Sequence, residues 1–408
     1  MRVDSSTLSG KVMCGYQGWY RCPGDGSQLE WVHYRGQGSL HFKPGTCGID
    51  FWPDLTEMDE DEKYKTAFHR KDGSDAYVFS SVNPKTTMRH FKWMRDHGID
   101  GAVVQRFLME VQNGTSREAQ LRADSFNRVL ELCRQGANTY GRSYCVMYDL
   151  SNIRLGYIDR AMTDWKFLVD EMGITRDPDD RSYQRHAGGP VVGIWGMGFG
   201  HVQVTPEDCQ RFLDFLKHDP KYGGNTILLG VSTGWRTLDR DVANDPRWHD
   251  VWKKADILSP WSVGRIANAA DVRHQLEQDW KPDLAWCREN SIEYMPVVFP
   301  GFAWSNLKKG TNENPDAFID RRDGQFLWEQ YVAARELGAT FVYQAMFDEM
   351  DEGTQNFKVT NDPPVGESKF KTYGDLPSDH YLWLVGEAGK MLRGEIPATA
   401  VLPNRSNP

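Results

Sequence analysis

The chain has 408 residues, 12% of them aromatic, and its 48 Lys and Arg against 57 Asp and Glu give a formal net charge of −9. This acidic balance argues against a nucleic-acid partner, because binding to a phosphate backbone needs a basic surface. No apolar run approaches the roughly 20 residues of a membrane helix. The sequence therefore predicts a globular protein without a membrane span.

The seven cysteines are spread along the chain without a CxxC pair, and the eleven histidines show no HxxxH or HxH spacing. Cys14, Cys133 and Cys145 lie in apolar stretches typical of a core. We therefore expect no metal and no organic cofactor. The first residues lack the apolar stretch of a signal peptide. Two locations stay open: the cytoplasm, or the periplasm or exterior for the mature part of an exported protein.

Short apolar and β-branched runs recur along the chain and alternate with helical patterns. From the second run onward their starts lie about 30 to 47 residues apart, the length of one strand–helix unit. Eight such units are typical of a (β/α)8 TIM barrel, an α/β fold, and we expect residues 1–408 to form one as a single domain. The predicted strands are 12–14, 102–104, 144–147, 191–194, 227–231, 257–258, 295–299 and 341–343.

The segments between these strands carry helix signals. Apolar residues at three-residue spacing predict a helix over 86–97 that stops at Gly98, and a stripe over 126–133 predicts one that ends before Gly136. Thr205 and the proline after it predict a helix start. Further helices are expected before Gly338 and over 381–392.

Two segments interrupt the repeat. Residues 21–83 are predicted as a long insertion, and residues 351–378 as a long loop with the turn signature TNDPP. Both are expected on the face formed by the C-terminal strand ends, where barrel enzymes carry their active sites. The six acids between Asp54 and Glu62 are expected to form the solvated start of a helix.

Every predicted strand is followed by an aromatic residue beside a polar residue or a glycine. Aromatic faces offer apolar surface to a sugar, while charged and amide groups bind its hydroxyls. The alternative for any single aromatic ring is ordinary packing at the top of the barrel. For His201, a structural role is as good an explanation as binding a substrate hydroxyl. We expect sugar platforms at Tyr16, Trp19, Tyr20, Trp195, Trp235, Trp261, Phe302 and Trp304, and hydroxyl contacts at Arg106, Asp149, His201 and Arg265.

The eighth strand is followed by DEMDEG at residues 348–353, four acids within five residues. Glu349 and Glu352 would lie about 10 Å apart on a continuing strand, but about 5–6 Å apart on a helical turn, which Gly353 favours. A solvated acidic loop is the alternative. One protonated and one ionised carboxyl flanking a bond are the groups that cleave glycosides, so we expect both glutamates to be catalytic.

The string FDEMDEGT at residues 347–354 resembles the WNEWxEGT signature of glycoside hydrolase family 99, the endo-α-mannosidase family. GYQGWY at residues 15–20 is similar to that family's first strand end, and the related family 71 has a comparable architecture. The resemblance spans about residues 10–395. It implies a (β/α)8 hydrolase that cleaves an α-linked glycan or polysaccharide with retention of configuration.

The resemblance also implies roles for the two glutamates. Glu349 would deprotonate the sugar 2-hydroxyl, which displaces the leaving group through a 1,2-anhydro intermediate, and Glu352 would act as general acid and then as base. Asp348 stands where the family has Asn, and Phe347 and Met350 where it has Trp, which predicts a divergent member. We expect Asp348 to join the substrate-binding groups and to raise a pKa in the pair.

Two other classes of function remain compatible with the sequence. A barrel could bind an oligosaccharide without cleaving it, with the acids only holding hydroxyl groups. A lyase or isomerase acting on a sugar would yield an unsaturated or isomerised product instead of new reducing ends.

Overall fold

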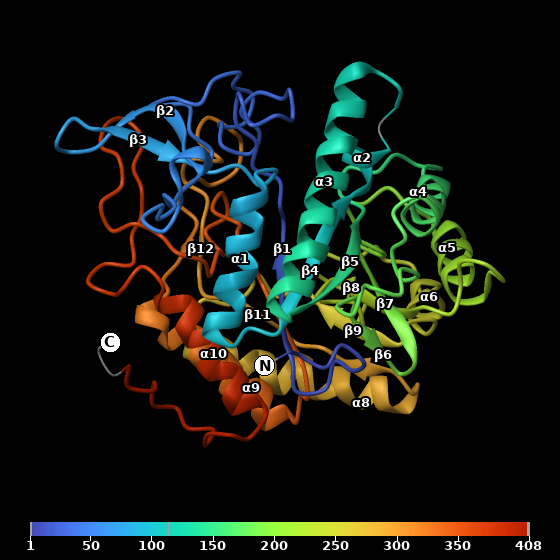
Figure 1. Cartoon of the computed structure of the whole chain (residues 1–408). Coiled ribbons are helices and arrows are strands. Elements are labelled where there is room, and N and C mark those ends of the chain that lie inside the picture. The colour runs from blue at the N-terminus through green and yellow to red at the C-terminus, as the bar shows by residue number, and fades with distance from the viewer. Residues whose placement is uncertain (1, 113, 406–408) are drawn as a thin grey trace.

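The computed structural model describes residues 2–112 and 114–405. A curled sheet of parallel strands runs through its centre, with helices on the outside (Figure 1). The strands lie side by side in the order β10, β9, β8, β7, β5, β4, β1, β14, β11, and β6 adds an antiparallel pair to β7. Their bounds are β1 Val12–Tyr16, β4 Gly101–Phe107, β5 Ser143–Asp149, β6 Arg185–His186, β7 Gly189–Trp195, β8 Thr226–Val231, β9 Ile257–Pro260, β10 Glu293–Tyr294, β11 Val297–Val298 and β14 Val342–Gln344.

Each of the eight predicted strands overlaps a strand of this sheet. The seventh, predicted over 295–299, overlaps β11, and β10 lies just before it. β10 pairs with β9, and β11 pairs with β14. Only Met295 and Pro296 separate β10 from β11, and Pro296 has no N–H to donate to a ladder. The hydrogen-bonded sheet is therefore a curled half-barrel that is open between β10 and β11.

Helices cover the outer face of the sheet, and their ends follow local signals. Gly98 and Gly338 end α1 and α9 with φ values of 76° and 83°, and the Thr205 side chain accepts a hydrogen bond from the amide of Asp208 at the start of α5. The bounds are α1 Pro84–His97, α2 Leu108–Val111, α3 Arg117–Tyr140, α4 Asp159–Asp170, α5 Pro206–His218, α6 Trp248–Trp252, α7 Ala269–Gln275, α8 Lys281–Glu289, α9 Gln325–Leu337 and α10 His380–Leu392.

One predicted helix end is wrong. α3 does not stop before Gly136 but continues to Tyr140 and ends at Gly141, whose φ is 63°. Gly136 lies in the helix because α3 packs against α1 there: a Cβ on Gly136 would lie 2.8 Å from the ring of Phe91. A glycine inside a helical pattern marks a close approach here rather than a cap.

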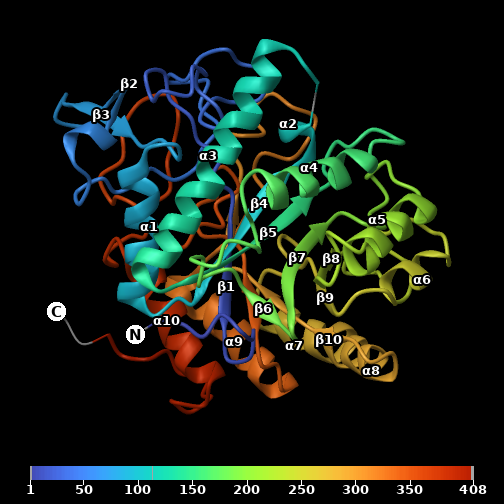
Figure 2. The same cartoon turned by 45° about the vertical axis from the view of Figure 1, so that its right-hand side comes forward.

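The insertion and the loop after β14 lie next to each other. The insertion holds the hairpin of β2 (Tyr64–His69) and β3 (Asp75–Val78), which lies at the upper left in both views (Figures 1 and 2). Isolated bridges join it to the loop, among them Pro53 with Val359 and His69 with Val365. The two segments thus lie side by side.

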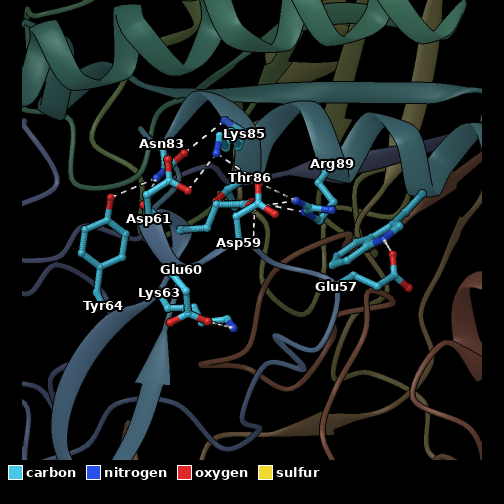
Figure 3. Close-up of polar contacts among 12 residues, drawn as sticks. Glu57, Asp59, Glu60, Asp61, Lys63, Tyr64, Asn83, Lys85, Thr86 and Arg89 are labelled. Atoms are coloured by element: carbon cyan, nitrogen blue, oxygen red, sulfur yellow. Dashed lines mark hydrogen bonds and ion pairs between the residues drawn. The ribbon is translucent and has the colours of Figure 1, made fainter.

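The acidic segment between Asp54 and Glu62 does not begin an α-helix as predicted. It forms one 3-10 turn, Glu60–Glu62, that leads into β2. Figure 3 shows why: cationic side chains of α1 hold it. Glu62 is buried and lies 2.5 Å from Arg89, and Lys85 lies 3.0 Å from Asp59 and 2.9 Å from Asp61. The segment anchors the insertion to α1.

All seven cysteines are buried and unpaired. Within the described part of the chain, no helix combines the length and the apolar character that crossing a membrane requires.

Candidate active site

The chain turns sharply after β14 and brings Glu349 and Glu352 to one cavity of about 210 Å³. Residues 350–353 form the turn. Gly353 has a left-handed φ of 65°, and a Cβ there would lie 2.8 Å from the amide nitrogen of Ala303, so the turn requires glycine. The cavity is further lined by Gln17, Trp19, Gln105, Phe107, Asp149, Ser151, Trp195, Trp261 and Met346.

Glu349 is held by two donors. Gln17 Nε2 donates to Oε1 and Thr354 Oγ1 donates to Oε2, each over 2.6 Å. Burial, with the charges of Glu352 and Asp351, raises the pKa of Glu349 well above its usual 4.5, and the two hydrogen bonds act in the opposite direction. The two donors favour the ionised form of Glu349, and burial favours the protonated form.

No described residue donates a hydrogen bond to the side-chain carboxyl group of Glu352. Its backbone carbonyl accepts from the amide of Ala303 over 2.9 Å, which ties the turn to the neighbouring segment. Burial and the charge of Asp351 raise the pKa of Glu352 to about 7, and Lys308 lowers it. Two such carboxyls at one cavity retain at least one proton near neutral pH.

Asp348 lines neither cavity and holds the first strand end to the turn that carries Glu349 and Glu352. Its Oδ1 accepts from the amide of Gln17 over 2.8 Å and its Oδ2 from the amide of Gly18 over 2.9 Å. Burial raises its pKa to about 7, while these hydrogen bonds lower it. Because backbone donors take both oxygens, Asp348 is a positioning residue rather than the predicted substrate contact.

Asp348→Asn is expected to cost about 1–3 kcal/mol of stability, because an amide NH2 would face one of two buried N–H donors. An asparagine offers only one acceptor oxygen. Urea unfolding of the variant measures the loss. Asp375→Asn is the control, since Asp375 is exposed. Equal unfolding free energies for Asp348→Asn and the wild type would contradict this role.

A second cavity of about 1060 Å³ adjoins the first and shares Trp195, Trp261 and Glu352 with it. The rings of Trp195 and Trp261, which line both cavities, pack edge to face with their centroids 6.1 Å apart. Eight of the predicted sugar contacts line one or both cavities. They are Trp19, Asp149, Trp195, His201, Trp261, Arg265, Phe302 and Trp304.

Several of these side chains already have partners. Arg265 lies 2.7 Å from Asp241, and Trp304 Nε1 donates to the carbonyl of Asn314 over 2.8 Å. Burial raises the pKa of Asp149 to about 6. Trp195 Nε1 is buried without a partner among the described residues, which leaves a donor for a ligand at the wall between the cavities.

Arg106 is not a sugar contact, contrary to the prediction. Its guanidinium is buried in an ion pair with Asp164, with Nη2 2.6 Å from Oδ1, and also donates to Asn127 over 2.9 Å. Successive side chains of a strand point to opposite faces. Gln105 therefore faces the cavity, and Arg106 faces the helices.

Three predicted aromatic platforms also lie outside both cavities. The Tyr16 hydroxyl lies 2.9 Å from His90 Nδ1, and Trp235 Nε1 donates to Asp283 over 3.1 Å. The Tyr20 hydroxyl donates to Asp351 over 3.1 Å and accepts from the amide of Met350 over 2.9 Å. All three rings are fully buried, so Tyr16 and Trp235 serve the core and Tyr20 supports the turn.

The prediction missed other residues of the two cavities. Gln17 contacts Glu349 directly, and Gln105 Nε2 donates to the Tyr343 hydroxyl over 2.8 Å. Gln105 is the first residue after the strand predicted over 102–104, so one further step of alternation would have found it. Gln17 lies three residues past the strand predicted over 12–14, which ends two residues before β1 does. Further unpredicted lining residues include Phe107, Ser151, Met346 and Lys308. Among residues 2–112 and 114–405, no group of three His, Cys, Asp or Glu is placed to hold a metal ion.

No family model matches the sequence, and no curated protein matches it. Solved structures do. The GH99 endo-α-mannosidase from Bacteroides thetaiotaomicron is similar with a TM-score of 0.66 and 17% identity, over 95% of this chain and 99% of that one. A structure of that enzyme with bis-Tris propane gives a TM-score of 0.67 and 18% identity over the same shares. A glycoside hydrolase-like protein gives 0.52 and 14%, over 87% of this chain and 98% of that one. The predicted resemblance to family 99 is thus confirmed in fold, at an identity that marks wide divergence.

Proposed function

We propose that the protein is a glycoside hydrolase that cleaves an α-linked glycan with retention, and that Glu349 and Glu352 carry the chemistry. The observation that carries the proposal is that both glutamates, with pKa values raised by burial, line one aromatic-walled cavity. Paired carboxyls of this kind are the groups that glycoside cleavage needs. The fold similarity to an endo-α-mannosidase supports an α-mannoside as the first substrate to test.

In the first step, Glu349 takes the proton of the sugar 2-hydroxyl, whose oxygen then bonds to C1. The bond from C1 to the leaving oxygen breaks, and Glu352 gives that oxygen its proton. In the second step, Glu352 takes a proton from water, which bonds to C1 as the bond from O2 to C1 breaks. O2 recovers its proton from Glu349. Two displacements at C1 retain the configuration.

The substrate spans more than one sugar unit on this account. The small cavity holds the sugar whose bond is cut, with Asp149 for its hydroxyls. The large cavity takes the neighbouring units between Trp195, Trp261, Phe302 and Trp304. Aromatic faces bind apolar sugar surfaces there. No metal and no organic cofactor takes part in this mechanism.

The proposal includes one closed (β/α)8 barrel as a single domain. Residues 293–298 act as its seventh strand despite the break at Pro296. Two hydrogen bonds across the break support this closure: the amide of Met295 donates to Leu258, and the amide of Tyr343 donates to Pro296. Barrel enzymes carry their sites at the C-terminal strand ends.

Hydrolysis is expected to lose its acid catalyst as pH rises through about 7. Burial raises the pKa of Glu352 to about 7, so this group keeps its proton at a higher pH than an ordinary glutamic acid and loses it above that value. kcat/KM should therefore fall as the pH rises above about 7 and Glu352 loses its proton. A pH profile of kcat/KM that stays flat across pH 7 contradicts the acid role.

A panel of α-linked oligosaccharides tests the proposed function. New reducing ends from at least one α-mannoside or α-glucan are expected, and an unsaturated or isomerised product would indicate the lyase or isomerase alternative. Tight binding of an oligosaccharide without any product would indicate a binding protein.

A further inference from the structure

His33, in the insertion between β1 and β2, contacts two separate parts of the site. Its ring stacks on the indole of Trp19, with centroids 3.7 Å apart and planes 4° apart. Its Nδ1 lies 3.2 Å from Oδ2 of Asp351, in the turn that carries both glutamates. One imidazole thus joins the cavity wall to the catalytic turn.

The backbone at His33 is held in an uncommon conformation. Its φ is 60°, in the left-handed region that few residues other than glycine adopt. Both neighbours are fixed: Val32 pairs with Arg21, and the carbonyl of Tyr34 accepts from the amide of Gly48 over 2.7 Å. Such a conformation persists where the surrounding structure determines it, and it is enriched at functional sites.

Two rings stack on the indole of Trp19. Phe107 covers the indole at a centroid distance of 5.1 Å and a plane angle of 26°, while His33 covers it at 3.7 Å. Trp19 is 9% exposed and lines the small cavity. The two stacked rings therefore hold Trp19 in place at the wall of the small cavity.

The contact with Asp351 fixes the other side of the site. The Asp351 side chain is 4% exposed, and its Oδ1 accepts from the Tyr20 hydroxyl. Its charge raises the pKa values of Glu349 and Glu352. A donor on Oδ2 sets where this charge lies relative to both carboxyls.

We propose that His33 is a positioning residue, which fixes the cavity wall through Trp19 and the catalytic turn through Asp351. The assignment rests on the proposed function. No sequence motif pointed to this residue, because the contacts join the insertion to a strand end far along the chain.

Two variants separate the two contacts. His33→Asn tolerates the left-handed φ and keeps an N–H donor for Asp351, but it removes the ring. His33→Phe keeps the ring but cannot donate. On a glycan that the wild type hydrolyses, His33→Asn is expected to raise KM about fivefold with kcat nearly unchanged, and His33→Phe to lower kcat about tenfold with KM nearly unchanged.

A second readout needs no substrate. The indole N–H resonance of Trp19 should move in His33→Asn, which loses the stacked ring, and stay near its wild-type position in His33→Phe. The proposal would be overturned if the two variants changed kcat and KM in the same way, or if both moved that resonance by the same amount. His33 would then be a purely structural residue. A wild type that hydrolyses no glycan would overturn the proposed function, and the resonance would still decide the contact with Trp19.

Discussion

Replacing Glu349 or Glu352 by glutamine is expected to lower kcat by about 10²-fold or more on a hydrolysed glycan, since either change removes proton transfer. Glutamine keeps the size of the side chain, so the cavity stays intact. The two losses should differ with the leaving group. An aryl glycoside with an acidic phenol needs little protonation, so Glu352→Gln should recover activity on it, whereas Glu349→Gln should not.

Glu367→Gln is the matched control, because Glu367 is an exposed residue of the loop after β14, and it should have the wild-type rate. Initial rates on the oligosaccharide and on the aryl glycoside measure all three variants. Turnover near the wild-type rate in both cavity variants would remove these residues from the mechanism. Equal recovery of both on the aryl glycoside would contradict the division of roles.

Arg106→Met is expected to cost about 3–5 kcal/mol of stability, the usual cost of leaving one partner of a buried ion pair unpaired. Asp164 would remain buried with only the Tyr148 hydroxyl, at 2.8 Å, and the amide of Gln112, at 3.4 Å, as its side-chain donors. At temperatures where the variant is folded, KM should stay close to that of the wild type, since Arg106 faces the helices.

Arg211→Met is the control for this change. Arg211 pairs with Asp159 over 2.8 Å, but both side chains are about half exposed or more, so the loss should be no more than about 1 kcal/mol. Chemical unfolding and KM are measured on both variants. A raised KM with unchanged stability in Arg106→Met would restore the sugar contact predicted from the sequence.

The strand–helix order was predictable because each unit carries its own local signals. β8 and its neighbours are buried apolar runs, and Gly98, Gly338 and Thr205 mark helix ends by short-range chemistry. The split of the seventh strand was not predicted, although Pro296 marks it. The end of α3 was misplaced because Gly136 is a glycine for the sake of close packing against Phe91 and does not cap the helix. The local sequence does not reveal that contact.

The acidic pair was predictable because the motif, the position after the last strand and Gly353 all indicate the same turn. Side-chain direction was predicted less well. Arg106 was assigned to the site although strand alternation turns it outward. His33 could not be found from sequence, because its partners Trp19 and Asp351 meet it only in the folded chain.

The most direct test of the central claim is NMR of the first sugar product formed from an α-linked oligosaccharide. The paired action of Glu349 and Glu352 predicts a new reducing end that appears first as the α-anomer and only later equilibrates. A β-anomer formed first would contradict the two-step mechanism, and the absence of any new reducing end across the panel would contradict hydrolysis itself.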